Sequence, residues 1–219
     1  MKATSLFGGV QVFNILISIV RSKFIALFIG PTGMGIASLF NTTINVVDAV
    51  TNLGLNRSAV KDISYAKENY EANNVARTIH VLKRLVWFTA VIGAVLMMIT
   101  SPWLSEIAFE SKEYTLSFIW LSVALLFKQF THSNLAILQG LQKLGNLAKA
   151  NLVGNTVGLL ITVPLYYFFR IDAIVPAIII ASLISFAITL YYASKTKVEK
   201  VPLTNKEAFS EGKDMIQLG

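Results

Sequence analysis

The chain has 219 residues, of which 54% are hydrophobic and 14% are charged, and its formal net charge is +7. Soluble domains carry about a quarter charged residues, so this composition argues against a soluble fold. The absence of cysteine excludes disulfides and thiolate metal sites. Most cations lie between long apolar blocks, a pattern that indicates membrane topology, and no nucleic-acid partner is expected.

Six apolar blocks predict an all-α integral membrane protein, a six-transmembrane-helix bundle over residues 1–194, because about 20 apolar residues cross a bilayer as a helix. The turn Gly30-Pro31-Thr32-Gly33 separates the first two spans, and Ser101-Pro102 closes the third. Residues 57–84 are polar with helical composition and predict an amphipathic cytoplasmic connector, lying along the membrane interface or solvated. The six predicted spans cover residues 5–29, 34–55, 85–104, 114–138, 148–169 and 173–194.

Lys and Arg residues predict the orientation of these spans. With the N-terminus in the cytoplasm, fourteen of them lie in inner segments and two, Lys112 and Arg170, lie in outer loops. This asymmetry follows the positive-inside rule and predicts a multi-pass membrane protein with a cytoplasmic N-terminus. Residues 195–219 predict a cytoplasmic linker that ends at the possible start of a seventh span, so we expect the chain to be the front portion of a longer protein.

Polar side chains form stripes within the apolar spans at helical spacing. Lipid cannot satisfy their hydrogen bonds, so the stripes should face one another or water. They fit either helix–helix adhesion or the lining of a polar cavity. The first stripe comprises Gln11, Asn14, Ser18 and Arg21; the second comprises Asn41, Asn45, Asp48 and Asn52; the fifth span contributes Asn151, Asn155, Gly158 and Thr162; and in the fourth, Lys128 and His132 share a face beside Gln129.

The charges within spans are harder to explain by adhesion. An arginine or lysine at a helix centre costs roughly 2.5–3.5 kcal/mol on insertion scales. Arg21 fits a structural ion pair with Asp48 across the first hairpin, a cavity wall, or a side chain that snorkels to the interface. Lys23 lies on another face and fits snorkelling. Lys128 has no acidic residue in its own span, which favours a wet cavity. Gly154-x-x-x-Gly158 is typical of a close helix contact.

Enzyme chemistry has no support in the sequence. There is no P-loop, no HExxH and no GxSxG. The two histidines fit no metal-ligand spacing. We therefore expect no enzyme activity, no cofactor and no metal.

The stretch from Val12 to Ser64, "VFNILISIVRSKFIALFIGPTGMGIASLFNTTINVVDAVTNLGLNRSAVKDIS", resembles the opening of Wzx-type polysaccharide flippases, or O-antigen translocases. These belong to the multidrug/oligosaccharidyl-lipid/polysaccharide exporter superfamily. The resemblance rests on Arg21, on the Gly30-Pro31-x-Gly33 turn and on "LGLNRSAV". It implies the N-terminal lobe of a two-lobed exporter, which surrounds a cavity that opens alternately to each side.

The resemblance further implies transport of a polyprenyl-pyrophosphate-linked oligosaccharide for O-antigen, lipopolysaccharide or other surface polysaccharide. Expected partners are this lipid-linked oligosaccharide, membrane lipid, H+ or Na+ as a coupling ion, and a second lobe or glycan-assembly proteins. A cation-coupled drug exporter of the same superfamily and a non-transporting partner of a glycan-assembly complex are the alternatives. The candidate cavity-lining residues are Arg21, Lys128, His132, Gln129, Asn14, Gln11, Asn45, Asp48 and Asn155.

Overall fold

The computed structural model describes the backbone of residues 2–68 and 72–196 and the side chains of residues 12–68 and 74–196. Within these ranges every regular element is helical, which confirms the predicted all-α fold. The predicted seventh span, the linker from residue 197 onward and the side chain of Gln11 lie outside the described residues. The elements are α1 (Lys2–Asn52), α2 (Leu55–Glu68), α3 (Ala72–Ile99), α4 (Ser101–Phe109), α5 (Thr115–Gly140), α6 (Leu144–Phe169), the 3₁₀ turn η1 (Arg170–Ala173) and α7 (Ile174–Ser194).

The long element α1 consists of two helices joined at a single residue. Gly30 has φ 68° and ψ −177°, a conformation outside the helical region that glycine adopts without a steric cost. Pro31 begins the second half, where its fixed φ suits a first helical turn and its missing N–H leaves no donor unpaired. The predicted turn over residues 30–33 is thus confined to Gly30, and residues 31–33 are already helical.

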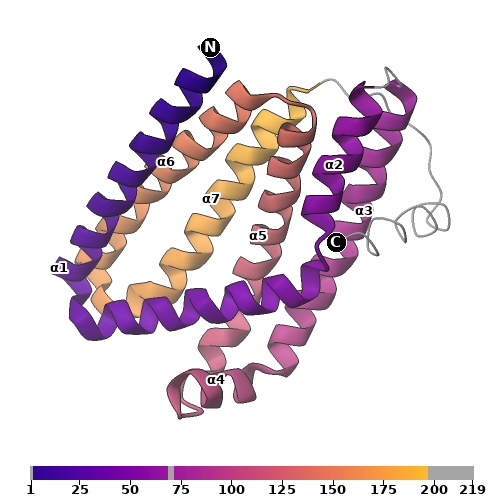
Figure 1. The fold of residues 1–219 in the computed structure, drawn as a ribbon. Helices are drawn as coiled ribbons and strands as arrows, with labels where there is room; N and C mark the ends of the chain where they lie inside the picture. Colours follow the sequence, from indigo (N-terminus) through magenta and orange to yellow (C-terminus); the bar gives the residue numbers. More distant parts are fainter. Residues whose placement is uncertain (1, 69–71, 197–219) are drawn as a thin grey trace.

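The two halves of α1 take different directions (Figure 1). Residues 2–29 run beside α6, whereas residues 31–52 cross the bundle steeply towards α2 and α3. The main apolar core forms at this crossing. Phe40 is 1% exposed, and its ring centroid lies 5.0 Å from that of Phe109 and 5.2 Å from that of Phe118. Burial of these rings stabilises the crossing, so residues 34–55, predicted as a second span antiparallel to the first, do not pack along it.

The predicted connector over residues 57–84 forms α2 and the first turns of α3. Its apolar side does not lie open to lipid headgroups but packs into a second core, where Ala59 and Ile63 of α2 contact Ile79, Leu82 and Val86 of α3 and Ile137 of α5. Gly140 allows this contact, because a Cβ there would lie 2.7 Å from the Cβ of Ile63. Lys67 donates a hydrogen bond of 2.9 Å to the carbonyl of Leu141, just beyond the end of α5.

Among the described residues, three segments are long and apolar enough to cross a membrane: Val12–Asn52, Asn74–Ile99 and Leu144–Ser194. The first and third have 41 and 51 residues and each contains two of the predicted spans, divided at Gly30 and at η1. Since α5 is not among the three, the predicted count of six spans is not confirmed. Large apolar side chains are exposed on the outer surface of these segments, including Leu27 at 74% and Phe168 at 73%, as expected for helices facing lipid.

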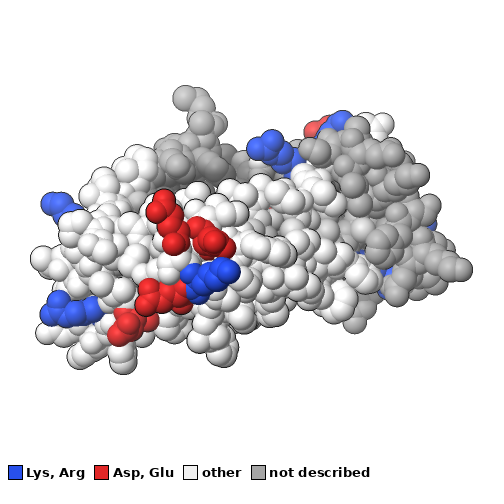
Figure 2. All heavy atoms as spheres, turned by 90° about the horizontal axis from the view of Figure 1, so that it is seen from below, with Lys and Arg blue, Asp and Glu red and all other residues white. Residues whose placement is uncertain are grey.

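Figure 2 shows the molecule from the end that carries α4. Most of this face is uncharged, and the acidic side chains gather in one small group. Glu106, Glu110 and Glu113 are exposed around α4, and Lys112 lies 3.9 Å from Glu106 in a solvent-accessible ion pair. Such an exposed pair contributes little to stability, about 0–1 kcal/mol.

Candidate functional site

A cavity of about 340 Å³ lies among α1, α5, α6 and α7. Four predicted site residues line it: Arg21, Lys128, His132 and Asn155. Two of these are permanent cations, and the lining contains no Asp or Glu. The cavity therefore combines positive charge with neutral hydrogen-bonding groups. Its other polar lining residues are Asn41, Thr131, Thr162, Tyr166, Ser182 and Ser185.

Arg21 reaches this cavity from the first half of α1. Its Nη2 donates a hydrogen bond of 3.3 Å to the carbonyl of Asn155 on α6. Its Nε is buried without a hydrogen-bond partner. In the part of the chain that the structure describes, no carboxylate forms an ion pair with it. A guanidinium has five N–H donors, so most of the hydrogen-bonding capacity of Arg21 is not used by the protein.

Two glycines of α6 open space on this side of the cavity. A Cβ at Gly158 would lie 3.3 Å from the Nη2 of Arg21, whereas a Cβ at Gly154 would meet nothing within 4 Å. The two glycines line the cavity and do not form the close helix contact that their spacing predicts. Gly158 instead leaves room for the guanidinium of Arg21.

The polar stripes of α1 and α6 meet as predicted. Asn155 donates a hydrogen bond of 3.0 Å from Nδ2 to Oδ1 of Asn14. This contact joins residues that are 141 positions apart, and Asn14 lies about two turns of α1 from Arg21. Asn155 therefore positions the first half of α1 through its side chain, and its backbone carbonyl accepts the hydrogen bond from Arg21.

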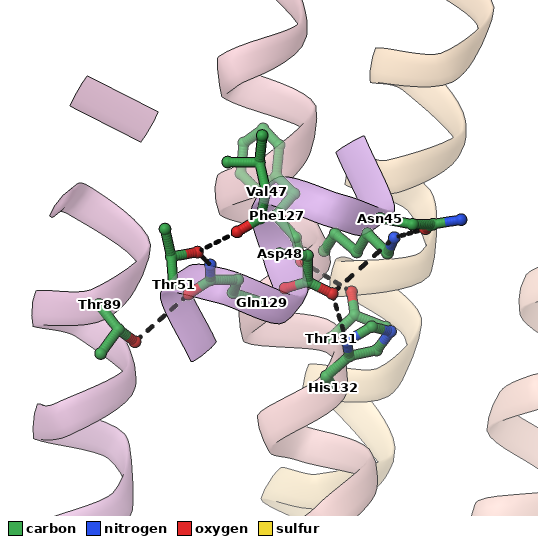
Figure 3. A network of polar contacts seen from close by, with 10 residues as sticks. Asn45, Val47, Asp48, Thr51, Thr89, Phe127, Gln129, Thr131 and His132 are labelled. Atoms are coloured by element: carbon green, nitrogen blue, oxygen red, sulfur yellow. Dashed lines mark hydrogen bonds and ion pairs between the residues drawn. The ribbon is translucent and has the colours of Figure 1, made fainter. Parts of the chain in front are cut away.

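A second polar cluster comprises Asn45, Asp48, Lys128 and His132 (Figure 3). Asp48 Oδ2 lies 3.8 Å from Lys128 Nζ and 3.3 Å from His132 Nδ1. Lys128 also donates a hydrogen bond to Oδ1 of Asn45. At 3.8 Å and an effective dielectric constant of about 20, the Coulomb attraction of the Lys128–Asp48 pair is about 4 kcal/mol. The hydration lost on burial offsets part of it.

Of the three alternatives for Arg21, the ion pair with Asp48 is not formed, because the carboxylate pairs with Lys128 and His132. The span of Lys128 contains no acidic residue, but the lysine is nevertheless paired. Its partner, Asp48, lies on α1. Asn45 and Asp48 do not themselves line the cavity; they contact Lys128, which does.

Gln129 is not a lining residue either. It is 1% exposed and lies about 100° around α5 from Lys128, so it faces the interior of the bundle. Its Nε2 donates 2.7 Å to the hydroxyl of Thr51, and its Oε1 accepts 3.3 Å from the hydroxyl of Thr89. Figure 3 shows Gln129 between these two threonines. Gln129 therefore joins α1, α3 and α5 and contributes to packing.

Sequence reasoning missed several hydroxyl groups of the cavity. Ser182 and Ser185 are three positions apart on α7, and this spacing is a signal that can be read from the sequence. Tyr166 is 5% exposed and also lines the cavity. Asn41 belonged to a predicted stripe but not to the predicted site.

A second cavity, of about 750 Å³, lies at the junction of α1 and α2. Its polar lining includes Asn52, Asn56, Arg57 and Gln139. His132 lines both this cavity and the one that contains Arg21. The cluster around Asp48 therefore lies where the two cavities approach each other.

The apolar helices, the lipid-facing surface and the cationic cavity define a helical membrane protein. The chain belongs to the polysaccharide biosynthesis protein family, whose model matches residues 24–215. Comparisons with curated proteins and with solved structures gave no significant match. The matched range contains Lys128 and Asp48 but begins after Arg21, so the role of Arg21 remains a prediction from its geometry and from the resemblance of the first span.

Proposed function

We propose that this protein transports a lipid-linked oligosaccharide across the bacterial cytoplasmic membrane, as a Wzx-type flippase does. The cargo is a polyprenyl-pyrophosphate-linked sugar used for a surface polysaccharide such as O-antigen. Transport proceeds by alternating access and breaks no covalent bond, so the protein is a transporter and not an enzyme. The observation that carries this proposal is the cavity lined by Arg21 and Lys128 in a member of a polysaccharide biosynthesis family.

The chemistry of the cavity supports an anionic head group. Arg21 offers free N–H donors in a fork that matches phosphate oxygens, and Lys128 adds a mobile point charge. Hydroxyl and amide groups nearby are suitable partners for sugar hydroxyls. The volume of about 340 Å³ is at the lower end for small-molecule sites, so it fits a phosphate head and not a whole oligosaccharide. The lipid tail remains in the bilayer while the head moves.

The proposed topology has six spans, a cytoplasmic N-terminus and an outer surface at the α4 end. Its support is the concentration of Lys and Arg in the predicted inner segments. H+ or Na+ is the proposed coupling ion, and a second lobe or glycan-assembly proteins complete the machinery. A cation-coupled drug exporter fits less well, because Asp48, the one buried carboxylate near the cavity among the residues that the structure describes, is already paired with Lys128.

Reconstitution tests this function directly. The natural full-length protein is placed in liposomes with a polyprenyl-pyrophosphate-linked oligosaccharide in the inner leaflet, and a lectin added outside reports sugar that has crossed. We expect lectin binding to rise with time in liposomes that contain the protein and to stay at the background of protein-free liposomes otherwise. If liposomes with correctly folded protein show no more lectin binding than protein-free liposomes, the proposal is contradicted. This result would favour a non-transporting partner of glycan assembly.

A further inference from the structure

Asp48 has a particular position relative to the two cavity cations. Its side chain is 9% exposed and lies behind Lys128, whose side chain is 23% exposed and reaches the cavity. Asp48 Oδ2 contacts both Lys128 and His132, and its Oδ1 is buried without a hydrogen-bond partner. Among the described residues, no carboxylate pairs with Arg21. Within this part of the chain, one cavity cation therefore carries an internal counter-ion and the other does not.

We propose that Asp48 is an exchangeable counter-ion, which neutralises Lys128 in the unloaded protein and releases it to a phosphate group that enters the cavity. This inference rests on the proposed function and deepens it, because it assigns a residue that determines which anions bind. Asp48 does not touch the ligand; it acts through Lys128. The phosphate must replace the attraction that Lys128 loses when it turns from Asp48.

The geometry of the pair allows this exchange. Charge-assisted N–H···O hydrogen bonds are about 2.7–2.9 Å long, so the 3.8 Å between Lys128 Nζ and Asp48 Oδ2 is an ion pair without a direct hydrogen bond. The lysine ammonium sits on a flexible four-carbon stem with three rotatable donors. It can therefore turn towards the cavity while its stem stays in place.

His132 keeps the carboxylate in place when Lys128 leaves, because its Nδ1 remains 3.3 Å from Oδ2. Asn45 contacts Lys128, and this hydrogen bond breaks when the lysine turns. His132 also lines both cavities. Exchange at Asp48 thus changes charge at the point where the two cavities approach each other.

The class of ligand follows from the competition between Asp48 and the entering anion for Lys128. A monoanion only exchanges one negative partner of Lys128 for another, whereas a phosphate or pyrophosphate with two or more charges contacts Lys128 and Arg21 together. Asp48 therefore selects polyvalent phosphates over carboxylates and other monoanions. The phosphate can belong to a lipid head group or to a free ion, and the two sources share this chemistry.

Calorimetry on the full chain tests the exchange. The protein is placed in nanodiscs of phosphatidylcholine, and inorganic pyrophosphate is titrated at constant pH and ionic strength. We expect Asp48→Asn to tighten binding about tenfold, or about 1.4 kcal/mol, because Lys128 no longer has to leave a charged partner. The gain should vanish when Asp48→Asn is combined with Lys128→Gln. Asp48→Glu keeps the charge and should not tighten binding.

Matched controls separate exchange from general electrostatics. Glu106→Gln removes the acid of the exposed ion pair with Lys112 and should leave pyrophosphate binding unchanged. Nanodiscs that contain phosphatidic acid test the lipid source: if lipid phosphate occupies the cavity, it should weaken pyrophosphate binding more in Asp48→Asn than in Asp48→Glu. If it has no effect in any variant, the ligand is a free phosphate and the exchange stands.

Wild-type protein provides a test that does not depend on the folding of a variant. Carbodiimide with an added amine modifies free carboxylates, and mass spectrometry measures modification at Asp48. Pyrophosphate should increase it at least about threefold, because Lys128 is drawn away. Unchanged modification, or equal affinities in wild type and Asp48→Asn, would overturn the exchange while the proposed function stands. Loss of pyrophosphate binding in every form, together with no transport, would instead overturn the proposed function.

Discussion

Gln129 provides a direct test of how the polar groups divide between packing and binding. Gln129→Met keeps the approximate length and volume of the side chain and removes its two hydrogen bonds. Because Gln129 is 1% exposed and faces Thr51 and Thr89, the change removes bonds inside the bundle and leaves the cavity lining unaltered. We therefore expect lower stability with normal transport.

The loss of stability in Gln129→Met depends on which hydrogen bonds Thr51 and Thr89 keep. Side-chain hydrogen bonds in membrane proteins contribute about 0.6 kcal/mol on average, and in soluble proteins about 1 kcal/mol. The hydroxyl of Thr51 still donates to the carbonyl of Val47 at 2.8 Å, and that of Thr89 to the carbonyl of Val86 at 3.2 Å. Neither donor is left unpaired, so the loss for Gln129→Met should be about 1–2 kcal/mol. Gln129→Ala also creates a cavity and should cost about 2–5 kcal/mol.

The assay is equilibrium unfolding of the purified protein in mixed micelles, combined with transport measured per folded protein. Gln139→Met is the matched control, because it places the same substitution at an exposed position of the same helix. It should change the free energy of unfolding by less than about 0.5 kcal/mol. Reduced transport by Gln129→Met at unchanged stability would contradict a packing role and place Gln129 among the residues that bind the substrate.

Three further predictions concern Arg21, α2 and topology. Gly158→Ala should reduce transport because its Cβ would lie 3.3 Å from the guanidinium of Arg21, whereas Gly154→Ala, with nothing within 4 Å, should transport normally; equal rates in the liposome assay would contradict the role of Gly158. Lys67→Met should lower the free energy of unfolding by about 1 kcal/mol because the carbonyl of Leu141 loses its charged donor, and unchanged unfolding in micelles would count against this cap. Reporter fusions after Lys112 and after Lys200 should report opposite sides of the membrane, and the same side for both would exclude the proposed topology.

The sequence predicted much of the cavity because helical spacing determines which polar groups share a face. Asn14 and Arg21 lie on one face of α1, and both meet Asn155 of α6. Lys128 and His132, four residues apart, both reach the cavity. These predictions depend only on the angular positions of side chains around a single helix, and sequence spacing determines those positions.

The partner of Asp48 could not be predicted in this way. The alternative in which Asp48 pairs with Arg21 requires residues 34–55 to return alongside the first span. The single break at Gly30 sends residues 31–52 across the bundle instead, and apolar packing of Phe40 at the crossing determines where they lie. Asp48 therefore meets α5, and the same crossing brings Thr51 to Gln129. Spacing within a helix does not specify the angle between helices.

The central claim is that Arg21 lies in the membrane to bind the phosphates of the substrate. The decisive measurement is the initial rate of lipid-linked oligosaccharide translocation in liposomes for Arg21→Gln and for Lys23→Gln, each normalised to folded protein. Both variants lose one cation from the same helix, but Arg21 lines the cavity whereas Lys23 is exposed. We expect a loss of at least about tenfold for Arg21→Gln, consistent with a charged hydrogen bond of about 1.5–3 kcal/mol, and a near-normal rate for Lys23→Gln. Equal rates for the two variants would contradict this claim.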